Sequence, residues 1–514
     1  MSDLIATLAM HVQHNPDRVA LVDGDEKVSL SQLWQKVRAL AFVLSNAGVK
    51  HGDRVAIIGP NTQEWVQVYL AAMASGAVAV PLNPDLRGAD LAALIRHAEA
   101  DVVFADISAR VVEDLITHLP EVTWLAKSKR FTGRCIALSE IEHEFAPEVS
   151  GALTDLGCIL YTSGTSGAPK GVMLSHVSLL QNAIDVADYL ELSSADVSLA
   201  LLPFYYSFGN SVLVTHLLSG ARLVFGASLM YPEKLMALVE AEGVTGLAGV
   251  PTLFQLLLKR DLLSDIRWRS LRYVAQAGGA LSAPAAERLS AALPWCKIFV
   301  MYGQTEATAR ICYLSPEYLL EKPGSVGWPM PDTCVQIRDE HGEHLPAGEV
   351  GQIWVRGPGL MQGYWRNKLA TDKVLIDGWL RTGDMGEMDS RGFLYIRGRR
   401  SDMLKVSGQR LHPQEIEAVI SELPEVSECA VDGVDDEVLG QVPRVFVVLK
   451  PDAELSPQAL LRYCRSQLVG WKVPRYVEMI GALPKTGSGK VQRNMLAELL
   501  SHVPKITGSE KGNL

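Results

Sequence analysis

The chain has 514 residues, too many for one compact domain, and 48% of them are hydrophobic and 21% charged, which excludes collagen-like and mostly disordered classes. The net charge of −10 disfavours nucleic acid as a partner, because phosphate backbones are repelled. The seven cysteines form no CxxC pair and are odd in number, which predicts reduced thiols in a cytoplasmic protein. Because the longest apolar run, roughly residues 68–82, is too short to span a bilayer and the start has no signal-peptide pattern, we expect no membrane insertion.

The first half of the chain alternates segments with helical spacing and short apolar strands, punctuated by glycine and proline. This β-α-β rhythm predicts a parallel α/β sheet. The expected helices cover residues 30–47 and 62–75, and the expected strands cover residues 53–59 and 77–82.

The second half changes character. Residues 330–400 alternate apolar and polar positions between turn signals, which predicts antiparallel hairpins. After Arg400 the pattern indicates a small α+β domain. Its expected helices are residues 414–423 and 456–468, and its expected strands are residues 426–431 and 444–449.

The sharpest local feature is the segment Tyr161–Gly171, YTSGTSGAPKG, directly after an apolar strand. It concentrates four hydroxyls, two inner glycines and Lys170, and such a loop can surround an anion with backbone N–H groups, hydroxyls and a positive charge. It is not a Walker A loop, since Gly171 stands where Ser or Thr must follow the lysine. Lys490, in a second glycine-rich loop, is followed by Val491 and fails the same test, which disfavours a P-loop NTPase.

Tyr161–Gly171 resembles the signature phosphate loop of the adenylate-forming (AMP-binding) superfamily, which includes acyl- and aryl-CoA synthetases, adenylation domains and beetle luciferases. Four further segments resemble its motifs in the same order, and the resemblance spans about residues 20–493. They are YGQTE at 302–306, RTGD at 381–384, the hinge segment at 398–417 and PKTGSGK at 484–490.

The resemblance implies the architecture. It predicts a large N-terminal domain, residues 1–401, with two doubly wound α/β subdomains and a β-barrel-like subdomain. A small, mobile α+β C-terminal lid, residues 402–514, would carry the catalytic lysine.

The resemblance also implies a two-step reaction. A carboxylic acid reacts with ATP, assisted by Mg²⁺, to give an acyl-adenylate, and coenzyme A then takes the acyl group. The alternative is a stand-alone adenylation enzyme that loads a separate acyl carrier protein through its phosphopantetheine. A non-catalytic relative would lack Glu306, Asp384 or Lys490, and all three are present. The oligomeric state stays open.

Matching motif positions imply the residues that handle the nucleotide phosphates. Glu306 would ligate Mg²⁺, Thr305 would donate its hydroxyl to the α-phosphate, and Lys490 would stabilise charge during adenylation. The residues implied to hold the β- and γ-phosphates are Thr162, Ser163, Gly164, Thr165, Ser166, Gly167 and Lys170.

Other motif residues are implied to bind the adenosine. The ribose would contact Asp384 and Arg399. The residues expected along the adenine are Gly278, Gly279, Ala280, Tyr302 and Gly303. Asp402 falls at the hinge position about which the lid would rotate, and Gly408 would line the path of the thiol.

Residues 202–209, LPFYYSFG, resemble the family's aromatic segment beside the acyl group, with Tyr206 where many CoA ligases carry histidine. No carboxylate stands there to hold an ammonium group, which argues against α-amino acids. The candidate pocket residues are Tyr206, Ser207, Asn210, Val250, Gln276, Met301, Gln304 and Arg310. Most are apolar or neutral, which favours an aryl or short-to-medium acyl group, and the hinge phrase is similar to aryl-CoA ligases. Arg310 either pairs with a second carboxylate of the acid or forms a structural ion pair.

Overall fold

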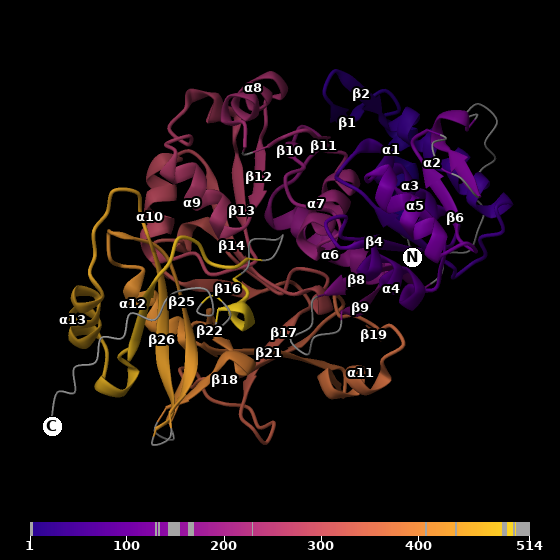
Figure 1. Ribbon diagram of the computed structural model, residues 1–514. Helices are drawn as coiled ribbons and strands as arrows, with labels where there is room; N and C mark the ends of the chain where they lie inside the picture. Colours follow the sequence, from indigo (N-terminus) through magenta and orange to yellow (C-terminus); the bar gives the residue numbers. More distant parts are fainter. Residues whose placement is uncertain are drawn as a thin grey trace. The chain divides into compact units, whose positions relative to one another are not determined.

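The computed structural model describes residues 4–128, 131, 134–141, 155–162, 169–228, 230–406, 409–436, 439–485, 491–496 and 499, shown in Figure 1. The chain divides into two compact units. Unit 1 comprises residues 1–382 and 386–396, and unit 2 comprises residues 383–385 and 397–514. The predicted domain boundary between residues 401 and 402 stays a prediction.

One sheet of unit 1 has, in the described residues, the order β19-β9-β8-β4-β3-β5-β6-β7, and strands β3 to β8 pair in parallel. The strands are β3 (Arg54–Ile58), β4 (Val78–Leu82), β5 (Ala100–Ala105), β6 (Thr123–Ala126), β7 (Cys135–Ala137), β8 (Leu156–Thr162), β9 (Lys170–Ser175) and β19 (Gly363–Tyr364). Helices α4 (Gly88–Ala98) and α5 (Ala109–His118) pack on one face through their apolar side chains. Residues 53–59 and 77–82 were predicted as strands, and the structure confirms them as β3 and β4.

The larger sheet has, in the described residues, the order β17-β18-β21-β22-β16-β15-β14-β13-β12-β10-β11-β1-β2, with β20 paired to β21. Its strands are β1 (Val19–Asp23), β2 (Glu26–Ser29), β10 (Val197–Leu199), β11 (Arg222–Val224), β12 (Gly246–Gly249), β13 (Tyr273–Gln276), β14 (Lys297–Tyr302), β15 (Cys312–Leu314), β16 (Ser325–Pro329), β17 (Cys334–Arg338), β18 (Gly351–Arg356), β20 (Leu375–Ile376), β21 (Trp379–Met388) and β22 (Leu394–Arg399). The strands from β11 to β14 are parallel.

Several helices lie between the two sheets and carry most of the core of unit 1. Helix α3 is buried along its whole length, because it packs against β3 and β4 of one sheet and β1 of the other. Helix α6 contacts β8 and β9, and it packs against α7, which contacts β11. The helices in this layer are α1 (Leu4–His14), α2 (Leu30–Asn46), α3 (Gln63–Ala74), α6 (His176–Tyr189) and α7 (Ser207–Leu218). The predicted helices 30–47 and 62–75 are confirmed as α2 and α3.

The opposite face of the parallel strands is covered by further helices, visible beside β12 and β13 in Figure 1. They are α8 (Pro232–Glu242), α9 (Pro251–Lys259) and α10 (Ala283–Ala292). A short helix, α11 (Lys368–Val374), follows β19. The prediction of two α/β halves in a large N-terminal part is therefore confirmed.

Antiparallel pairing in residues 330–400 is confirmed, because β17 pairs with β18 and β20 pairs with β21. The predicted barrel-like subdomain is wrong for the described residues, which form no closed barrel. Strands β15 and β16 add antiparallel to the edge strand β14, so this region continues the parallel sheet instead of closing on itself.

Unit 2 is an α+β body, as predicted. Its elements are β23 (Leu404–Val406), β24 (Gln409–Leu411), α12 (Pro413–Ile420), β25 (Val426–Asp436), β26 (Gly440–Leu449), α13 (Pro457–Gln467) and β27 (Tyr476–Met479). Strands β25 and β26 are longer than their apolar runs, because the cross-strand pair Asp432–Arg444 extends the ladder beyond the hydrophobic residues, with Arg444 Nε 2.9 Å from Asp432 Oδ1.

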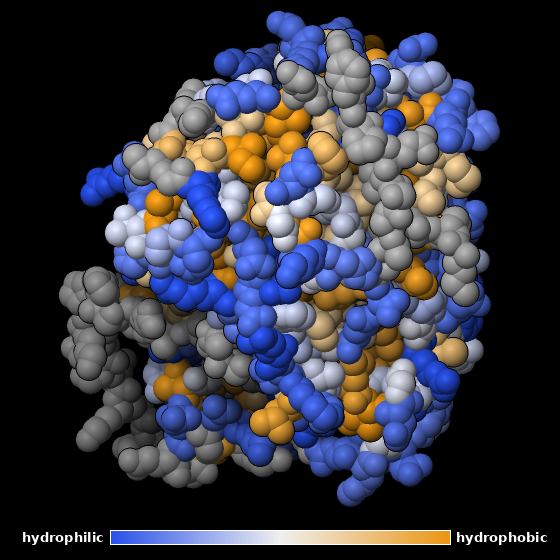
Figure 2. Space-filling view, turned by 90° about the vertical axis from the view of Figure 1, so that its right-hand side faces the viewer, coloured by the Kyte–Doolittle hydropathy of each residue, from blue (hydrophilic) through white to orange (hydrophobic). Residues whose placement is uncertain are grey.

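No helix in the described residues combines the length and the apolar character that crossing a bilayer requires. On the face shown in Figure 2, hydrophilic residues cover much of the surface and hydrophobic residues appear between them in several separate groups.

Candidate functional site

The carboxyl ends of β12, β13 and β14 meet at one edge of the larger sheet, because these strands are parallel and in register. Such edges are where open α/β sheets commonly bind ligands. The loop after β13 exposes Gly278, Gly279 and Ala280, and it is held by Gln276, whose Nε2 donates to Gly279 O at 2.9 Å. Val250, which follows β12, lies beside Gly278. The predicted adenine-binding segment therefore lies at an accessible sheet edge.

The chain reverses tightly after β14, because Tyr302 is paired antiparallel with Cys312 only ten positions later. A side chain at Gly303 would place its Cβ 2.0 Å from Ala309 O, so only glycine fits. Thr308 and Ala309 have φ of 50° and 77°, a left-handed backbone that is costly for residues with a Cβ. The strained turn presents Gln304, Thr305 and Glu306 at the same sheet edge.

Glu306 is held at this edge through its side chain and its backbone. Tyr364 donates its phenol proton to Glu306 Oε1 at 2.8 Å, and Met361 donates its backbone N–H to Glu306 O at 2.9 Å. Lys170 Nζ lies over the Tyr364 ring, 5.1 Å from its centroid. The structure thus brings together the Glu306 carboxylate, the Tyr364 phenol and the Lys170 ammonium group. Glu306 and Lys170 were predicted as site residues.

Tyr364 was missed by the sequence analysis. It belongs to no quoted motif, and it reaches the site because β19 pairs with β9, where Tyr364 is opposite Val172. That pairing joins segments nearly 200 positions apart and leaves no local pattern, so only the tertiary structure reveals this contact.

The structure describes only the two ends of the predicted phosphate loop. Thr162 and Lys170 are opposite each other in the hairpin of β8 and β9. The other predicted members lie outside the described residues, as do Lys490 and Gly408. Those loop members are Ser163, Gly164, Thr165, Ser166 and Gly167.

The aromatic segment before α7 meets the turn after β14. Thr305 donates its hydroxyl proton to Ser207 Oγ at 3.1 Å. Tyr206 lies against Tyr205, with ring centroids 4.5 Å apart, and burial raises the pKa of Tyr205 well above its usual value. Gly209 lets the chain turn closely into the helix, since a Cβ there would lie 2.1 Å from Pro203 O. The predicted acyl segment therefore contacts a predicted phosphate residue.

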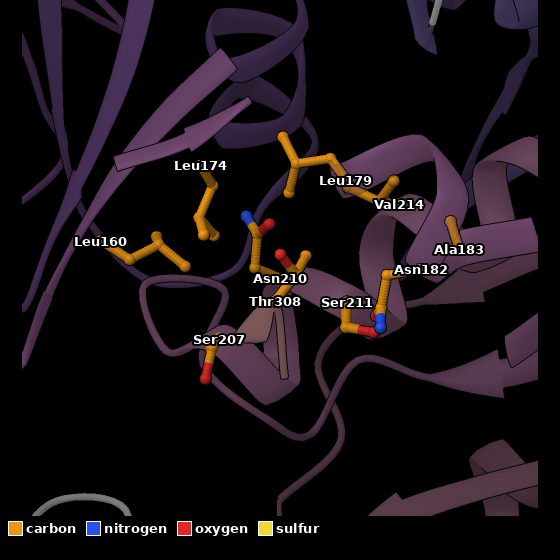
Figure 3. Close-up of a pocket in the computed structure, with 10 residues that line it drawn as sticks. All are labelled: Leu160, Leu174, Leu179, Asn182, Ala183, Ser207, Asn210, Ser211, Val214 and Thr308. Carbon is orange, nitrogen blue, oxygen red and sulfur yellow. The ribbon is translucent and has the colours of Figure 1, made fainter. Parts of the chain in front are cut away.

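A small cavity of about 10 Å³ lies next to this contact, large enough for about one water molecule (Figure 3). Ser207, Asn210 and Thr308 line it from the site side. Asn210 accepts a hydrogen bond from the Tyr69 phenol at 3.1 Å, and its Nδ2 has no partner among the described residues. Gln304 Nε2 is likewise buried without a partner in this part of the chain. Of the predicted pocket residues, Ser207 and Asn210 share this cavity, whereas Val250 and Gln276 belong to the adenine edge.

Unit 2 brings together the two predicted ribose residues. Arg399 Nε lies 3.1 Å from Asp384 Oδ1, and the Asp384 side chain is only 7% exposed. Asp402 ends the 3₁₀ turn Arg400–Asp402, and its Oδ2 lies 3.5 Å from Arg493 Nε. Arg493 also donates to Glu417 Oε2 at 2.8 Å. The predicted hinge residue is therefore tied to the segment that follows the lysine loop.

No group of three or more His, Cys, Asp or Glu that could hold a metal ion occurs in the described ranges. The candidate site therefore offers a metal ion one carboxylate, that of Glu306. One carboxylate suits Mg²⁺, which proteins usually hold by one or two carboxylates together with substrate phosphates.

Comparisons with known proteins agree with the motifs. The protein-family model of the AMP-binding enzymes matches residues 8–365. The family model of the AMP-binding enzyme C-terminal domain matches residues 415–490. A feruloyl-CoA synthase from an Amycolatopsis species is 34% identical over 479 residues, covering 93% of this chain and 95% of that protein. A 2-succinylbenzoate–CoA ligase from Bacillus licheniformis is 32% identical over 498 residues, covering 95% and 98%.

The fold is also found in a solved structure, o-succinylbenzoate CoA synthetase (MenE) from Bacillus subtilis in complex with the acyl-adenylate intermediate OSB-AMP. The TM-score is 0.84 and the identity 28%, with 99% of each chain covered. The predicted resemblance is thereby confirmed.

The turn after β14 gives a first testable prediction. Gly303→Ala forces a Cβ into Ala309 O and should cost about 3 kcal/mol, seen as a clearly lower thermal unfolding midpoint. Gly359→Ala, nearby, is the matched control, because its Cβ would lie at an ordinary 3.6 Å from Ala307 O. Equal midpoints for the two variants would contradict the steric account of the turn.

Proposed function

This chain belongs to the AMP-binding enzyme family, and we propose that it activates an aromatic carboxylic acid as its acyl-adenylate, with ATP and Mg²⁺, and passes the acyl group to coenzyme A. The general reaction is that of an AMP-forming acid–CoA ligase, which is also the activity named for its relatives. The observation that carries the proposal is the meeting of Lys170, Glu306 and Thr305 with the acyl segment at one sheet edge.

In the first step, a carboxylate oxygen forms a bond to the α-phosphorus and the bond to pyrophosphate breaks. Two anions have to approach, so the protein must neutralise charge and align the reactants. Lys170 and Thr162 would hold the outer phosphates. Thr305 would donate to the α-phosphate, and its hydroxyl already touches the acyl segment at Ser207.

Glu306 would hold the metal ion. Tyr364 donates its phenol proton to Glu306 Oε1, which orients the carboxylate, and Oε2 would take the ion. When bound, Mg²⁺ supplies positive charge to the phosphates. Lys490 would add a charge at the reacting oxygens, and Asp384 with Arg399 would bind the ribose hydroxyls.

In the second step, a thiolate attacks the acyl carbonyl and AMP leaves. The relatives are named as CoA ligases, which favours coenzyme A over a carrier protein as acceptor. The acids in the names of these relatives, ferulate and 2-succinylbenzoate, are aromatic, and the candidate pocket residues here are mostly neutral. A cytoplasmic location remains our prediction, because the cysteines are odd in number and no two stand in a CxxC spacing. Rotation of the lid at Asp402 and a thiol path past Gly408 also remain predictions.

The proposal is tested by measuring pyrophosphate release with a panel of aryl, short, medium and long acids, without and with coenzyme A. We expect release with an aryl acid that rises with coenzyme A and forms the thioester. Lys490→Ala should reduce the release at least about hundredfold. Formation of the acyl-adenylate without a thioester would contradict coenzyme A as the acceptor. Failure of every acid in the panel to cause pyrophosphate release would contradict the proposed substrate class.

Tyr364 provides a second test of the same site. Tyr364→Phe keeps the ring under Lys170 and removes the hydrogen bond to Glu306, so kcat/KM for ATP should fall about tenfold. Tyr318→Phe is the control, since that ring packs against Trp328 and Phe393 in another part of unit 1. Unchanged kinetics for Tyr364→Phe would show that the phenol does not position Glu306.

A further inference from the structure

Arg310 is a cation buried in the core of unit 1, with only 4% of its surface exposed. Its guanidinium lies over the Phe208 ring, 4.2 Å from the centroid, and Nε has no partner among the described residues. Burial lowers the pKa of Arg310, and the nearby Tyr189 phenol opposes this shift. Arg310 Nη1 donates to the neutral backbone oxygen Ala309 O at 3.4 Å. Buried charges are normally paired with an opposite charge. The structural ion pair considered for Arg310 is absent from the described part of the chain.

A second cavity of about 10 Å³ lies beside Arg310. Ser211 and Thr215 line it as well, and they are one helical turn apart on the same face of α7. Ser211 is 7% exposed and Thr215 1%, and neither hydroxyl has a partner among the described residues. One buried cation and two buried hydroxyls therefore face the same space.

The remaining titratable groups of this cavity carry no negative charge. His216 Nδ1 lies 2.7 Å from Val212 O, which can only accept, so this nitrogen carries the proton. His216 Nε2 then accepts from the Tyr273 phenol at 2.7 Å. Burial lowers the pKa of His216 to about 4, which keeps it neutral near pH 7. A positive site with spare hydroxyl donors, and with no counter-ion in the described part of the chain, is suited to an anionic oxygen.

The cavity beside Arg310 and the cavity beside the candidate site share Ser211 as a wall. The cavity beside the candidate site is also lined by Ser207, which accepts a hydrogen bond from Thr305. From Ser207 to Thr215 helix α7 rises about 12 Å. This is about the length of an aromatic acid with a short side chain. The ring of Phe208, which follows Ser207 in the chain, is stacked on Arg310.

We propose that Arg310, Ser211 and Thr215 form a receptor for a second carboxylate at the far end of the acid. This inference rests on the proposed function and names the substrate class: an aromatic acid with two carboxylates, one activated beside Thr305 and the other held by Arg310. Because each cavity holds about one water molecule, the side chains around them move apart when the acid binds.

The experiment compares pairs of acids that differ only in the distal group, a carboxylate in one and a carboxamide of the same shape in the other. The readout is kcat/KM for acid-dependent pyrophosphate release. We expect the wild type to prefer the diacid at least about tenfold, since hydrogen bonds to a charged group contribute about 1.5–3 kcal/mol. Arg310→Gln should abolish that preference, Arg310→Lys should restore part of it, and Thr215→Val should weaken it.

Arg391→Gln, on the surface of unit 1 where Arg391 pairs with Glu321, is the control and should keep the wild-type ratio. A variant that only damages the fold lowers kcat/KM for both acids equally and leaves the ratio unchanged. An unchanged ratio in Arg310→Gln, or a wild type that prefers the carboxamide, would overturn the inference.

A binding arm separates this inference from the proposed function. Calorimetry without ATP should show the diacid binding to the wild type more tightly than to Arg310→Gln, whether or not pyrophosphate is released. If the diacid binds in this way but no release occurs, the receptor stands and the ligase proposal fails. If release occurs with monoacids and the diacid binds both proteins equally, the receptor fails alone. A small anion is a further control. If bromide raises the thermal unfolding midpoint of the wild type and the diacid does not, the cavity is a halide site, and this would also overturn the inference.

Discussion

The close reversal of the chain between β14 and β15 is the constraint on which the candidate site depends. It requires glycine at 303, because Ala309 O occupies the place of a side chain, and it holds Thr308 and Ala309 in a left-handed backbone. Strain of this kind persists only where the surroundings enforce it, and it is concentrated at functional sites. From this one turn Thr305 reaches Ser207 and Glu306 reaches Tyr364. The phosphate, metal and acyl predictions therefore converge on a single short segment.

Much of the fold and of the site was predictable from the sequence, because the relevant signals are local. Apolar strands between helices predicted the parallel sheets, and the glycine-rich loop together with YGQTE predicted the family. Tyr364 was not predictable, since its role depends on strand pairing between distant segments. The barrel-like subdomain was predicted wrongly, because hairpin patterns do not reveal whether strands close on themselves or continue a neighbouring sheet.

The role of Arg310 was likewise not predictable from the sequence. The sequence left open whether it pairs with the acid or with the protein, and only the packing around it decides against a protein carboxylate in the described residues. A buried charge without a counter-ion lowers stability, and proteins retain such costs where a ligand makes use of them. Ser211 and Thr215, whose spare hydroxyls point to the same cavity, carried no signal in the sequence because serine and threonine are common in helices.

The central claim is that Glu306, held by Tyr364 at the turn after β14, binds the metal ion that accompanies ATP. The most direct measurement is the affinity for ATP with Mg²⁺ and with EDTA, in the wild type and in Glu306→Gln, which keeps an acceptor for the Tyr364 phenol. The account predicts that Mg²⁺ strengthens ATP binding to the wild type at least about tenfold and leaves binding to the variant nearly unchanged. An equal gain from Mg²⁺ in both proteins would contradict it.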